Sequence, residues 1–312
     1  MKTIAIDNYG NREELVAKEL ARPEPAADEI LIEIKAAAVN PIDWKLREGY
    51  LTEKIKLEFP IVLGWDAAGI VSKTGHQVEK FQVGDRVFVR PELTNRGTYA
   101  EYTTAKADLA ALIPDNIDFQ TAAAVPLAGL TAYQALLDVG QLKASEKVLI
   151  HAGAGGVGSF AIQIAKNLGA KVATTASSRN IDFLKELGAD KVINYQTTDF
   201  SKELDDYDLV IDTMGGKIQE NSFSVLKRGG RLVSIVQKPD DKKAKSLGIK
   251  ADLHWLIPDG NELSILAEMM QKKSLKPIVG KTFPFSESGL KSAHQLSESH
   301  HAKGKIIINI TD

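Results

Sequence analysis

Isoleucines recur with a period of two near the start of the chain. The stretch "EILIEIKAAAV" places Ile30, Ile32 and Ile34 two residues apart, which is the period of a β-strand. The β-prone runs "AAGIVSKTG", "VGDRVFV" and "GTYAEYTT" follow, and glycine, proline and aspartate separate them. This pattern predicts a twisted barrel or sandwich of short strands. A short helix is expected over "PIDWKLREG", ending at Gly49.

The middle of the chain changes to a strand–helix alternation. "EKVLIHAG" (146–153) is expected to be a strand that runs into glycines, and "GSFAIQIAKNLG" (158–169) an amphipathic helix. "KVATTA" is the next strand, and "SSRNIDFLKELG" the next helix, with Ser178 or Asn180 as its cap and Gly188 as its end. The runs "KVINY", "DLVIDT", "GRLVSIV" and "DLHWLI" are further strands. About six strands in this alternation predict a doubly wound parallel sheet.

The last segment returns to mixed elements. Two amphipathic helices are expected over "NELSILAEMMQKK" and "SESGLKSAHQLSES", and a strand over 303–310, "KGKIIINI". We therefore expect one β-rich domain formed by 1–122 with 263–312, and one parallel-sheet domain formed by 123–262. The chain would cross between the two domains twice.

Composition excludes several classes of function. The 312 residues are 44% hydrophobic and 26% charged, which is typical of a soluble globular protein. The formal net charge of −2 gives no attraction to nucleic acid or to an anionic membrane. The absence of cysteine excludes disulfides, thiolate metal sites and cysteine nucleophiles. The start of the chain has no signal-peptide core, and no apolar run is long enough to span a membrane, so a cytoplasmic location is expected.

The junction between the first strand and the first helix of the parallel sheet carries a G-x-G-x-x-G pattern. Its candidate cofactor-binding residues are Gly153, Ala154, Gly155, Gly156, Val157 and Gly158. A strand before the pattern and a helix after it are the context that a dinucleotide site requires. We expect the first glycine to make the tight turn, the second to let a pyrophosphate approach the backbone, and the third to let the helix pack close to the strand. The helix N-terminus then stabilises the phosphate charge. A plain strand–helix turn is the alternative.

The end of the second parallel strand indicates which cofactor binds. A site that selects NADH has an acidic residue there, but "TTASSRN" has none before Asp182. Ser177, Ser178 and Arg179 can instead hydrogen-bond a 2′-phosphate, which favours NADPH over NADH. Tyr195, after the third strand, could add a hydroxyl. Helix capping by Ser178 and surface or packing roles for Arg179 and Tyr195 are the alternatives.

These residues give the chain a family resemblance. It resembles the zinc-independent medium-chain dehydrogenases/reductases, and within them the quinone oxidoreductases and enone (alkenal) reductases. The stretches that carry the resemblance include "AAAVNPIDWKLREG", "FPIVLGWDAAGIV", "AAVPLAGLTAYQAL", "VLIHAGAGGVGSFAIQIAKNLGA" and "HAKGKIIINI". The resemblance implies a GroES-like β-rich catalytic domain, a Rossmann domain with a doubly wound parallel sheet, and a homodimer joined along the sixth strand near 251–257.

The departures from zinc-dependent relatives bear on the chemistry. In those relatives a metal-binding cysteine stands at the position of Asn40, and a His-Glu pair at the positions of Trp65 and Asp66. These three side chains do not make a normal catalytic zinc shell. Because oxidation of an unactivated alcohol needs a Lewis acid, we expect an acceptor that is already electrophilic, a quinone or an α,β-unsaturated carbonyl.

Hydride transfer to such an acceptor places negative charge on its oxygen, which donors must stabilise. Asn40 and Lys45 are the candidate catalytic residues, with Tyr50 behind them. Lys45 or solvent could return the proton. The alternatives are an exposed helix face for Lys45, a turn-shaping role for Asn40, and a capping role for Asp43.

Further candidate cofactor residues come from the resemblance and from the position of ligands at the carboxyl ends of parallel strands. They are Thr131, Thr213, Met214, Ile235, Val236 and Lys305. Thr131 could instead bond its own helix, and Lys305 could merely flank a strand. The leading hypothesis is an NADPH-dependent quinone or enone oxidoreductase. A redox sensor or structural protein that binds NADPH without turnover is the alternative from another class, and an ordinary alcohol dehydrogenase is a third.

Overall fold

The computed structural model describes residues 1–310, and its chain divides into two compact units. The first unit contains 1–127, 258–273 and the chain from 277 onward. The second unit contains 128–257 with the short segment 274–276. The first unit is therefore interrupted in sequence by the second.

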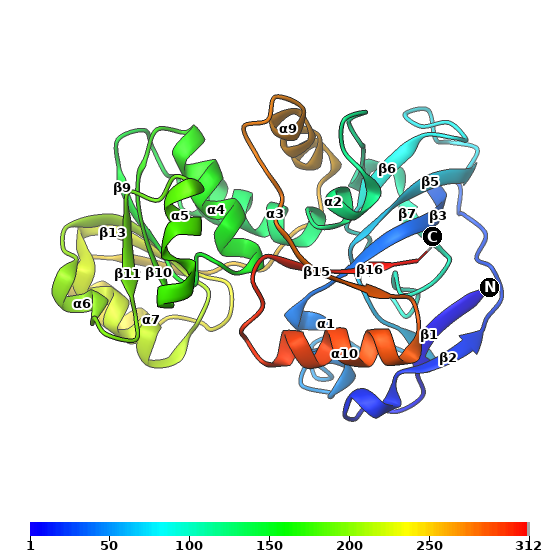
Figure 1. The fold of residues 1–312 in the computed structure, drawn as a ribbon, viewed down its shortest axis with the longest axis horizontal. Helices are drawn as coiled ribbons and strands as arrows, with labels where there is room; N and C mark the ends of the chain where they lie inside the picture. The colour runs from blue at the N-terminus through cyan, green and yellow to red at the C-terminus, as the bar shows by residue number, and fades with distance from the viewer. Residues whose placement is uncertain (311–312) are drawn as a thin grey trace. The chain divides into compact units, whose positions relative to one another are not determined.

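The main sheet of the first unit has seven strands within the described chain, in the order β15-β16-β3-β5-β6-β8, with β7 paired to β3 (Figure 1). The long strand β3 is central because it pairs with three neighbours. Ile30, Ile32 and Ile34 are fully buried, as the alternation predicts, and Leu31 on the other face is buried too. The strands are β3 (Glu29–Val39), β5 (Ala67–Thr74), β6 (Arg86–Val89), β7 (Tyr102–Lys106), β8 (Ala110–Leu112), β15 (Val279–Pro284) and β16 (Lys305–Asn309).

A smaller antiparallel sheet and four helices complete this unit in the described residues. The sheet has the order β2-β1-β4. Its strands are β1 (Lys2–Ile6), β2 (Val16–Glu19) and β4 (Ile61–Val62). The helices are α1 (Pro41–Arg47), α2 (Phe119–Ala123), α9 (Gly260–Gln271) and α10 (Glu287–Glu298), and 3₁₀ turns form at Arg12–Glu14 and Ala107–Leu109. The expected short helix after β3 is confirmed, with Gly49 in the left-handed region at φ 83°.

The second unit contains a six-stranded sheet in the described chain, with the order β11-β10-β9-β12-β13-β14. Every neighbouring pair is parallel. This is the doubly wound sheet that the strand–helix alternation predicts. Its strands are β9 (Lys147–Ile150), β10 (Lys171–Ala176), β11 (Lys191–Asn194), β12 (Tyr207–Asp212), β13 (Leu226–Ser234) and β14 (Lys250–Leu253).

The helices of this sheet lie between its strands in the chain. They are α4 (Gly156–Asn167), α5 (Ile181–Glu186), α6 (Phe200–Glu203), α7 (Gly216–Ser222) and α8 (Asp241–Leu247), with α3 (Pro126–Gln134) and a π-helical turn (Ala135–Val139) leading into β9. Two 3₁₀ turns cover Ser178–Asn180 and Phe223–Val225. None of the helices in residues 1–310 has the length and apolar character that a bilayer crossing requires.

Of the two residues expected to cap the helix after β10, Asn180 is confirmed at the cap position of α5 and Ser178 is wrong. Ser177, rather than Ser178, occupies the cap position of the 3₁₀ turn there, and its side chain makes no capping hydrogen bond. Asn180 stands at the cap position of α5, although its side chain makes no capping hydrogen bond. The Ser178 hydroxyl contacts Gln196 Oε1 at 3.4 Å instead. The physical reason is that the chain turns once more before α5 begins, so the serine side chains lie outside that helix.

Candidate functional site

The glycine loop lies between β9 and α4, as expected. Gly155 caps α4 with an extended backbone, φ −77° and ψ 177°, and no side chain caps this helix end. The first-turn N–H groups are therefore open to an external acceptor, and the helix dipole favours an anion there.

The glycines of this loop fit a pyrophosphate. A Cβ on Gly153 would stand 2.2 Å from Thr174 Oγ1, and one on Gly158 would stand 2.4 Å from the Ala152 carbonyl oxygen. These two glycines are needed by the fold itself. A Cβ on Gly155 would meet only the Ala152 carbonyl oxygen, at 3.3 Å. The second glycine thus leaves its face free for a ligand, which is the role that the motif assigns to it.

Polar side chains gather where β10 and β11 end. The Tyr195 N–H donates to the Ala176 carbonyl oxygen at 3.1 Å, which sets Tyr195 beside Ser177. Tyr195 is 56% exposed, and Ser178 and Arg179 are exposed as well. No carboxylate stands on the chain between β10 and α5. This set of hydroxyls and one guanidinium has the charge and the donors that a 2′-phosphate requires.

The loops after β12 and β13 carry the other candidate cofactor residues of this unit. Met214 and Val236 are 49% and 41% exposed. Thr213 donates its hydroxyl to the His151 carbonyl oxygen at 3.0 Å, so this hydroxyl can only accept from a ligand. Ile235 follows β13, and its N–H donates to the Asp212 carbonyl oxygen at 3.0 Å. Thr131 lies on α3 and is 6% exposed.

The candidate acceptor site of the first unit centres on Asn40, between β3 and α1. Asn40 is buried, and its Nδ2 donates to Asp66 Oδ2 at 2.8 Å. Lys305 on β16 donates to Asn40 Oδ1 and, at 3.0 Å, to Asp66 Oδ2. The N–H of Leu127 holds the other Asp66 oxygen at 2.6 Å. Because lysine can only donate, the Asn40 oxygen must face Lys305, and the amide presents its N–H groups on the other side.

Lys305 therefore supports Asn40 within the first unit. The other candidate cofactor residues belong to the second unit, and a contact between Lys305 and the cofactor stays a prediction.

The Asp43 side chain holds the backbone of Asn40 in place. Its Oδ2 accepts the Asn40 N–H at 2.8 Å and the Tyr99 hydroxyl at 2.6 Å, which gives it the expected capping role. Its Oδ1 is buried and has no partner among the described residues. Burial raises the pKa of Asp43 to about 7, although the bonds from Tyr99 and Asn40 act to lower it.

A hydrogen-bonded chain continues from Tyr99 to the surface. His294 Nε2 lies 3.2 Å from the Tyr99 hydroxyl, and its Nδ1 lies 2.9 Å from Arg47 Nη1. Because arginine only donates, Nδ1 accepts and Nε2 carries the proton. Burial and the Arg47 charge lower the pKa of His294 to about 3, so the ring is neutral.

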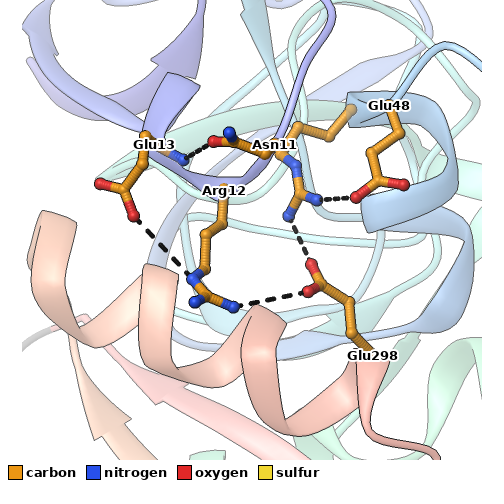
Figure 2. A pocket seen from close by; sticks show the side chains of 6 residues that line it. Asn11, Arg12, Glu13, Glu48 and Glu298 are labelled. Atoms are coloured by element: carbon orange, nitrogen blue, oxygen red, sulfur yellow. Dashed lines mark hydrogen bonds and ion pairs between the residues drawn. The ribbon is translucent and has the colours of Figure 1, made fainter.

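This series of hydrogen bonds ends at Arg47, which lines a cavity of about 220 Å³ (Figure 2). Arg47 donates from Nη1 to Glu298 Oε1 at 2.8 Å and pairs with Glu48. Figure 2 shows Arg12 reaching the same Glu298, whose Oε2 is 3.7 Å from Arg12 Nη1. The helix that begins after Asn40 is thereby tied to α10.

The two other candidate catalytic residues lie on or just after α1. Lys45 is half-buried, and burial lowers the pKa of its ammonium group. Tyr50 is 68% exposed and packs edge-on against Trp44, with 6.3 Å between ring centroids. Among the described residues, Asn40 bonds to Asp43 and Asp66, and the catalytic roles of Lys45 and Tyr50 stay predictions.

Several buried groups around Asn40 were not among the sequence candidates. Asp66, Tyr99 and His294 are each fully buried. Arg90 is 3% exposed and donates from Nη1 to the Pro91 carbonyl oxygen at 2.6 Å. Asp66 had a signal in the sequence, because it stands where zinc-dependent relatives have a metal-site carboxylate. Tyr99, His294 and Arg90 had no such signal in the sequence, because only folding brings these residues near α1.

In the part of the chain that the structure describes, no group of three or more His, Asp or Glu side chains is arranged to hold a metal ion. Trp65 is fully buried, and its Nε1 has no partner among residues 1–310.

Comparison with known proteins identifies the family of both units. The first unit matches the alcohol dehydrogenase GroES-like domain over residues 26–115. Residues 132–218 match the alanine dehydrogenase/PNT C-terminal domain, and residues 187–308 the zinc-binding dehydrogenase family. The chain is 33% identical to the chloroplastic quinone-oxidoreductase homolog of Spinacia oleracea, over 99% of this chain and 98% of that protein. The chain belongs to the medium-chain dehydrogenases/reductases, in their zinc-independent quinone and enone reductase branch.

Two further members of this branch are informative. The chloroplastic NADPH-dependent alkenal/one oxidoreductase of Arabidopsis thaliana is 33% identical over 99% of this chain and 79% of that protein. The structure of Escherichia coli quinone oxidoreductase complexed with NADPH matches with a TM-score of 0.89 and 31% identity, over 99% of this chain and 100% of that one. The family resemblance inferred from the motifs, the GroES-like fold and the Rossmann sheet are therefore confirmed for this reductase.

Proposed function

We propose that this chain is an NADPH-dependent, zinc-independent oxidoreductase that transfers a hydride to a quinone or an α,β-unsaturated carbonyl compound. The observation that carries the proposal is the buried Asn40–Asp66–Lys305 cluster. It holds a neutral amide donor at the position where zinc-dependent relatives have a metal-binding cysteine. The names of the relatives, which include quinone and alkenal reductases, support the same chemistry.

The second unit would hold NADPH. The open N–H groups at the start of α4 would bind the pyrophosphate, and Gly155 would let it reach the backbone. Ser177, Ser178 and Arg179 would bind the 2′-phosphate, with Tyr195 beside them. When bound, NADPH supplies the hydride.

The first unit would bind the acceptor. As the acceptor gains the hydride, negative charge develops on its oxygen, and an N–H group held in place beforehand stabilises that charge. One N–H of Asn40 Nδ2 is used by Asp66, which leaves the second for the acceptor oxygen. Lys45 can return the proton, because its lowered pKa makes the ammonium group a better acid at neutral pH.

Steady-state NADPH oxidation tests this function. The assay uses 9,10-phenanthrenequinone and a panel of alkenals, with the wild type and Asn40→Ala. We expect acceptor-dependent oxidation in the wild type and a kcat about 10²-fold lower in the variant, the cost of removing one oxyanion donor. Tight NADPH binding without any acceptor-dependent oxidation would favour a cofactor-binding sensor instead. Tightly held stoichiometric zinc in the purified protein would overturn the assignment to metal-free chemistry.

The proposal includes a homodimer joined along the sixth strand. β14 is an edge strand of the parallel sheet. Leu253, Trp255 and Ile257, on and after it, are 41%, 49% and 69% exposed. An apolar strand edge of this kind is suited to pairing with a second copy. Light scattering on the wild type and on Trp255→Glu would test it, and a wild-type monomer would contradict it.

A cytoplasmic location completes the proposal. A cysteine-free chain with a net charge of −2 is compatible with it, and so is a role without nucleic-acid or membrane partners. Fractionation of cells that express the chain would test the location.

A further inference from the structure

A carboxylate lies at the end of β12 that no catalytic or binding role yet uses. Asp212 is fully buried and accepts four hydrogen bonds. Its Oδ1 accepts from the N–H groups of Met214 and Gly215, each at 2.9 Å. Its Oδ2 accepts from Gln219 Nε2 at 2.9 Å and from the Ser234 hydroxyl at 2.8 Å. A buried carboxylate needs hydrogen-bond donors, and these four groups supply them.

The four donors come from two different segments. Met214, Gly215 and Gln219 belong to the loop after β12 and the helix that follows it, whereas Ser234 ends the neighbouring strand β13. Asp212 therefore joins the ends of both strands through one side chain. These are the carboxyl ends of parallel strands, where a ligand of an open sheet binds.

Two glutamines extend the same connection. Gln219 Nε2 also donates to the Gln237 carbonyl oxygen at 2.8 Å, and the Gly216 N–H donates to Gln237 Oε1 at 2.9 Å. The Ser234 hydroxyl in turn accepts the Gln237 N–H at 3.2 Å. The segment after β12 is thus bonded to the loop after β13 at two points, and one of them uses Gln219, which also donates to Asp212.

We propose that Asp212 is a positioning residue for the nicotinamide half of NADPH. It holds the loops that carry the candidate cofactor residues Met214 and Val236, and it acts through those loops without touching the cofactor. The inference rests on the proposed function, because it takes the carboxyl edge of β12 and β13 as the nicotinamide end of the NADPH site. The adenosine end, at Ser177 and Arg179, instead follows β10 in the chain.

An amide cannot replace the carboxylate here. In Asp212→Asn the amide oxygen can still accept the two loop N–H groups, but the new NH₂ group would face Gln219 Nε2, which is also a donor. Gln219 cannot turn its amide over without losing its bond to the Gln237 carbonyl oxygen. The variant thereby weakens the connection between the two loops at Asp212, while it keeps nearly the same side-chain volume.

The test compares a whole ligand with a fragment. Calorimetry gives the dissociation constants of NADPH and of 2′,5′-ADP, which contains the adenosine end alone, for the wild type and Asp212→Asn. We expect the NADPH constant to rise about tenfold to a hundredfold, as for a lost hydrogen bond to a charged group. The 2′,5′-ADP constant should stay at its wild-type value. The kcat should fall on the order of 10²-fold, because a small misplacement of the reacting group is costly.

A matched control lies on the same strand. Asp208 accepts the Lys147 N–H at 2.8 Å and pairs with Lys227, near the start of β12 and away from the loops. Asp208→Asn should leave both dissociation constants at their wild-type values. Circular dichroism and thermal unfolding check that each variant is folded. If Asp212→Asn does not fold, Ser234→Ala removes one donor only and should raise the NADPH constant in the same selective way.

Equal loss of both ligands, or no loss of either, would overturn the proposal. Turnover of the wild type with an acceptor tests the proposed function separately. The comparison of the two dissociation constants tests Asp212, so either inference can fail while the other stands.

Discussion

Removal of the Lys305 charge should destabilise the first unit measurably. Lys305 is 3% exposed, Asp66 is fully buried, and 3.0 Å separates Lys305 Nζ from Asp66 Oδ2. Lys305→Met keeps a long apolar side chain but leaves the Asp66 carboxylate without its cation. Breaking a buried ion pair from one side costs about 3–5 kcal/mol. Because Asn40 Nδ2 and the Leu127 N–H still donate to Asp66, we expect a loss at the lower end, about 3 kcal/mol.

Thermal unfolding gives the measurement. A loss of this size corresponds to a drop in Tm of about 6–12 °C for a folding unit of roughly 150–250 residues. The matched double variant Asp66→Asn with Lys305→Met removes both charges, and it should regain at least half of the loss because no unpaired charge remains buried. The control is Lys106→Met, which removes an exposed lysine paired with Glu92 and should cost less than about 1 kcal/mol.

Two outcomes would refute this reasoning. One is a Tm for Lys305→Met that is no lower than that of the Lys106→Met control. The other is a double variant that is no more stable than the single variant, since the loss would then come from packing and not from the charge left on Asp66.

Three further predictions concern the second unit. Arg179→Ala should weaken NADPH binding far more than NADH binding in calorimetry, and equal losses would show that Arg179 does not contact the 2′-phosphate. Gly155→Ala should fold normally but lose NADPH affinity, because its Cβ meets one atom at 3.3 Å and points where a phosphate would lie. Gly153→Ala should also lower the Tm, because its Cβ would lie 2.2 Å from a side-chain oxygen. Burial lowers the pKa of His151 from 6.5 to about 4. As the pH falls, the imidazole is therefore protonated in the unfolded chain before it is protonated in the folded protein. The free energy of unfolding should then fall by about 1.4 kcal/mol per pH unit between pH 6.5 and pH 4. Unfolding titrations with denaturant at several pH values should show less of this acid loss in His151→Gln and an unchanged loss in the exposed-residue control His76→Gln.

The parallel sheet and the glycine loop were predictable because their signals are local. Each strand of the second unit has its own apolar run, and the glycines follow the strand directly in sequence. The sequence placed Asn40 correctly at the junction of a strand and a short helix for the same reason. Of the two residues expected to cap the next helix, Asn180 stands at the cap position and Ser178 does not, because one extra 3₁₀ turn precedes that helix and no local pattern marks the turn.

The partners of Asn40 could not be read from the sequence in the same way. Asp66 is 26 residues away along the chain, and Lys305 is 239 residues from Asp66. The contact of His294 with Tyr99 spans 195 residues. Such contacts depend on the pairing order of strands from both ends of the first unit, and a single sequence carries no pairing signal over these separations. Asp212 was likewise visible only as a strand residue until the loops around it were known.

The pairing of β16 with β3 determines how late in synthesis the first unit, which would bind the acceptor, can finish folding. Ile306 lies opposite Val39, so the strand that leads to Asn40 obtains this neighbour only after some 300 residues have been translated. Lys305 arrives on the same strand. Until then Asn40 and Asp66 lack their cation, whereas the parallel sheet of the second unit, which is contiguous in sequence, can already be complete on the ribosome. The second unit, which would bind the cofactor, should therefore fold before the acceptor site of the first unit is complete. Nascent chains on ribosomes stalled near residue 290 should contain a folded second unit without that acceptor site.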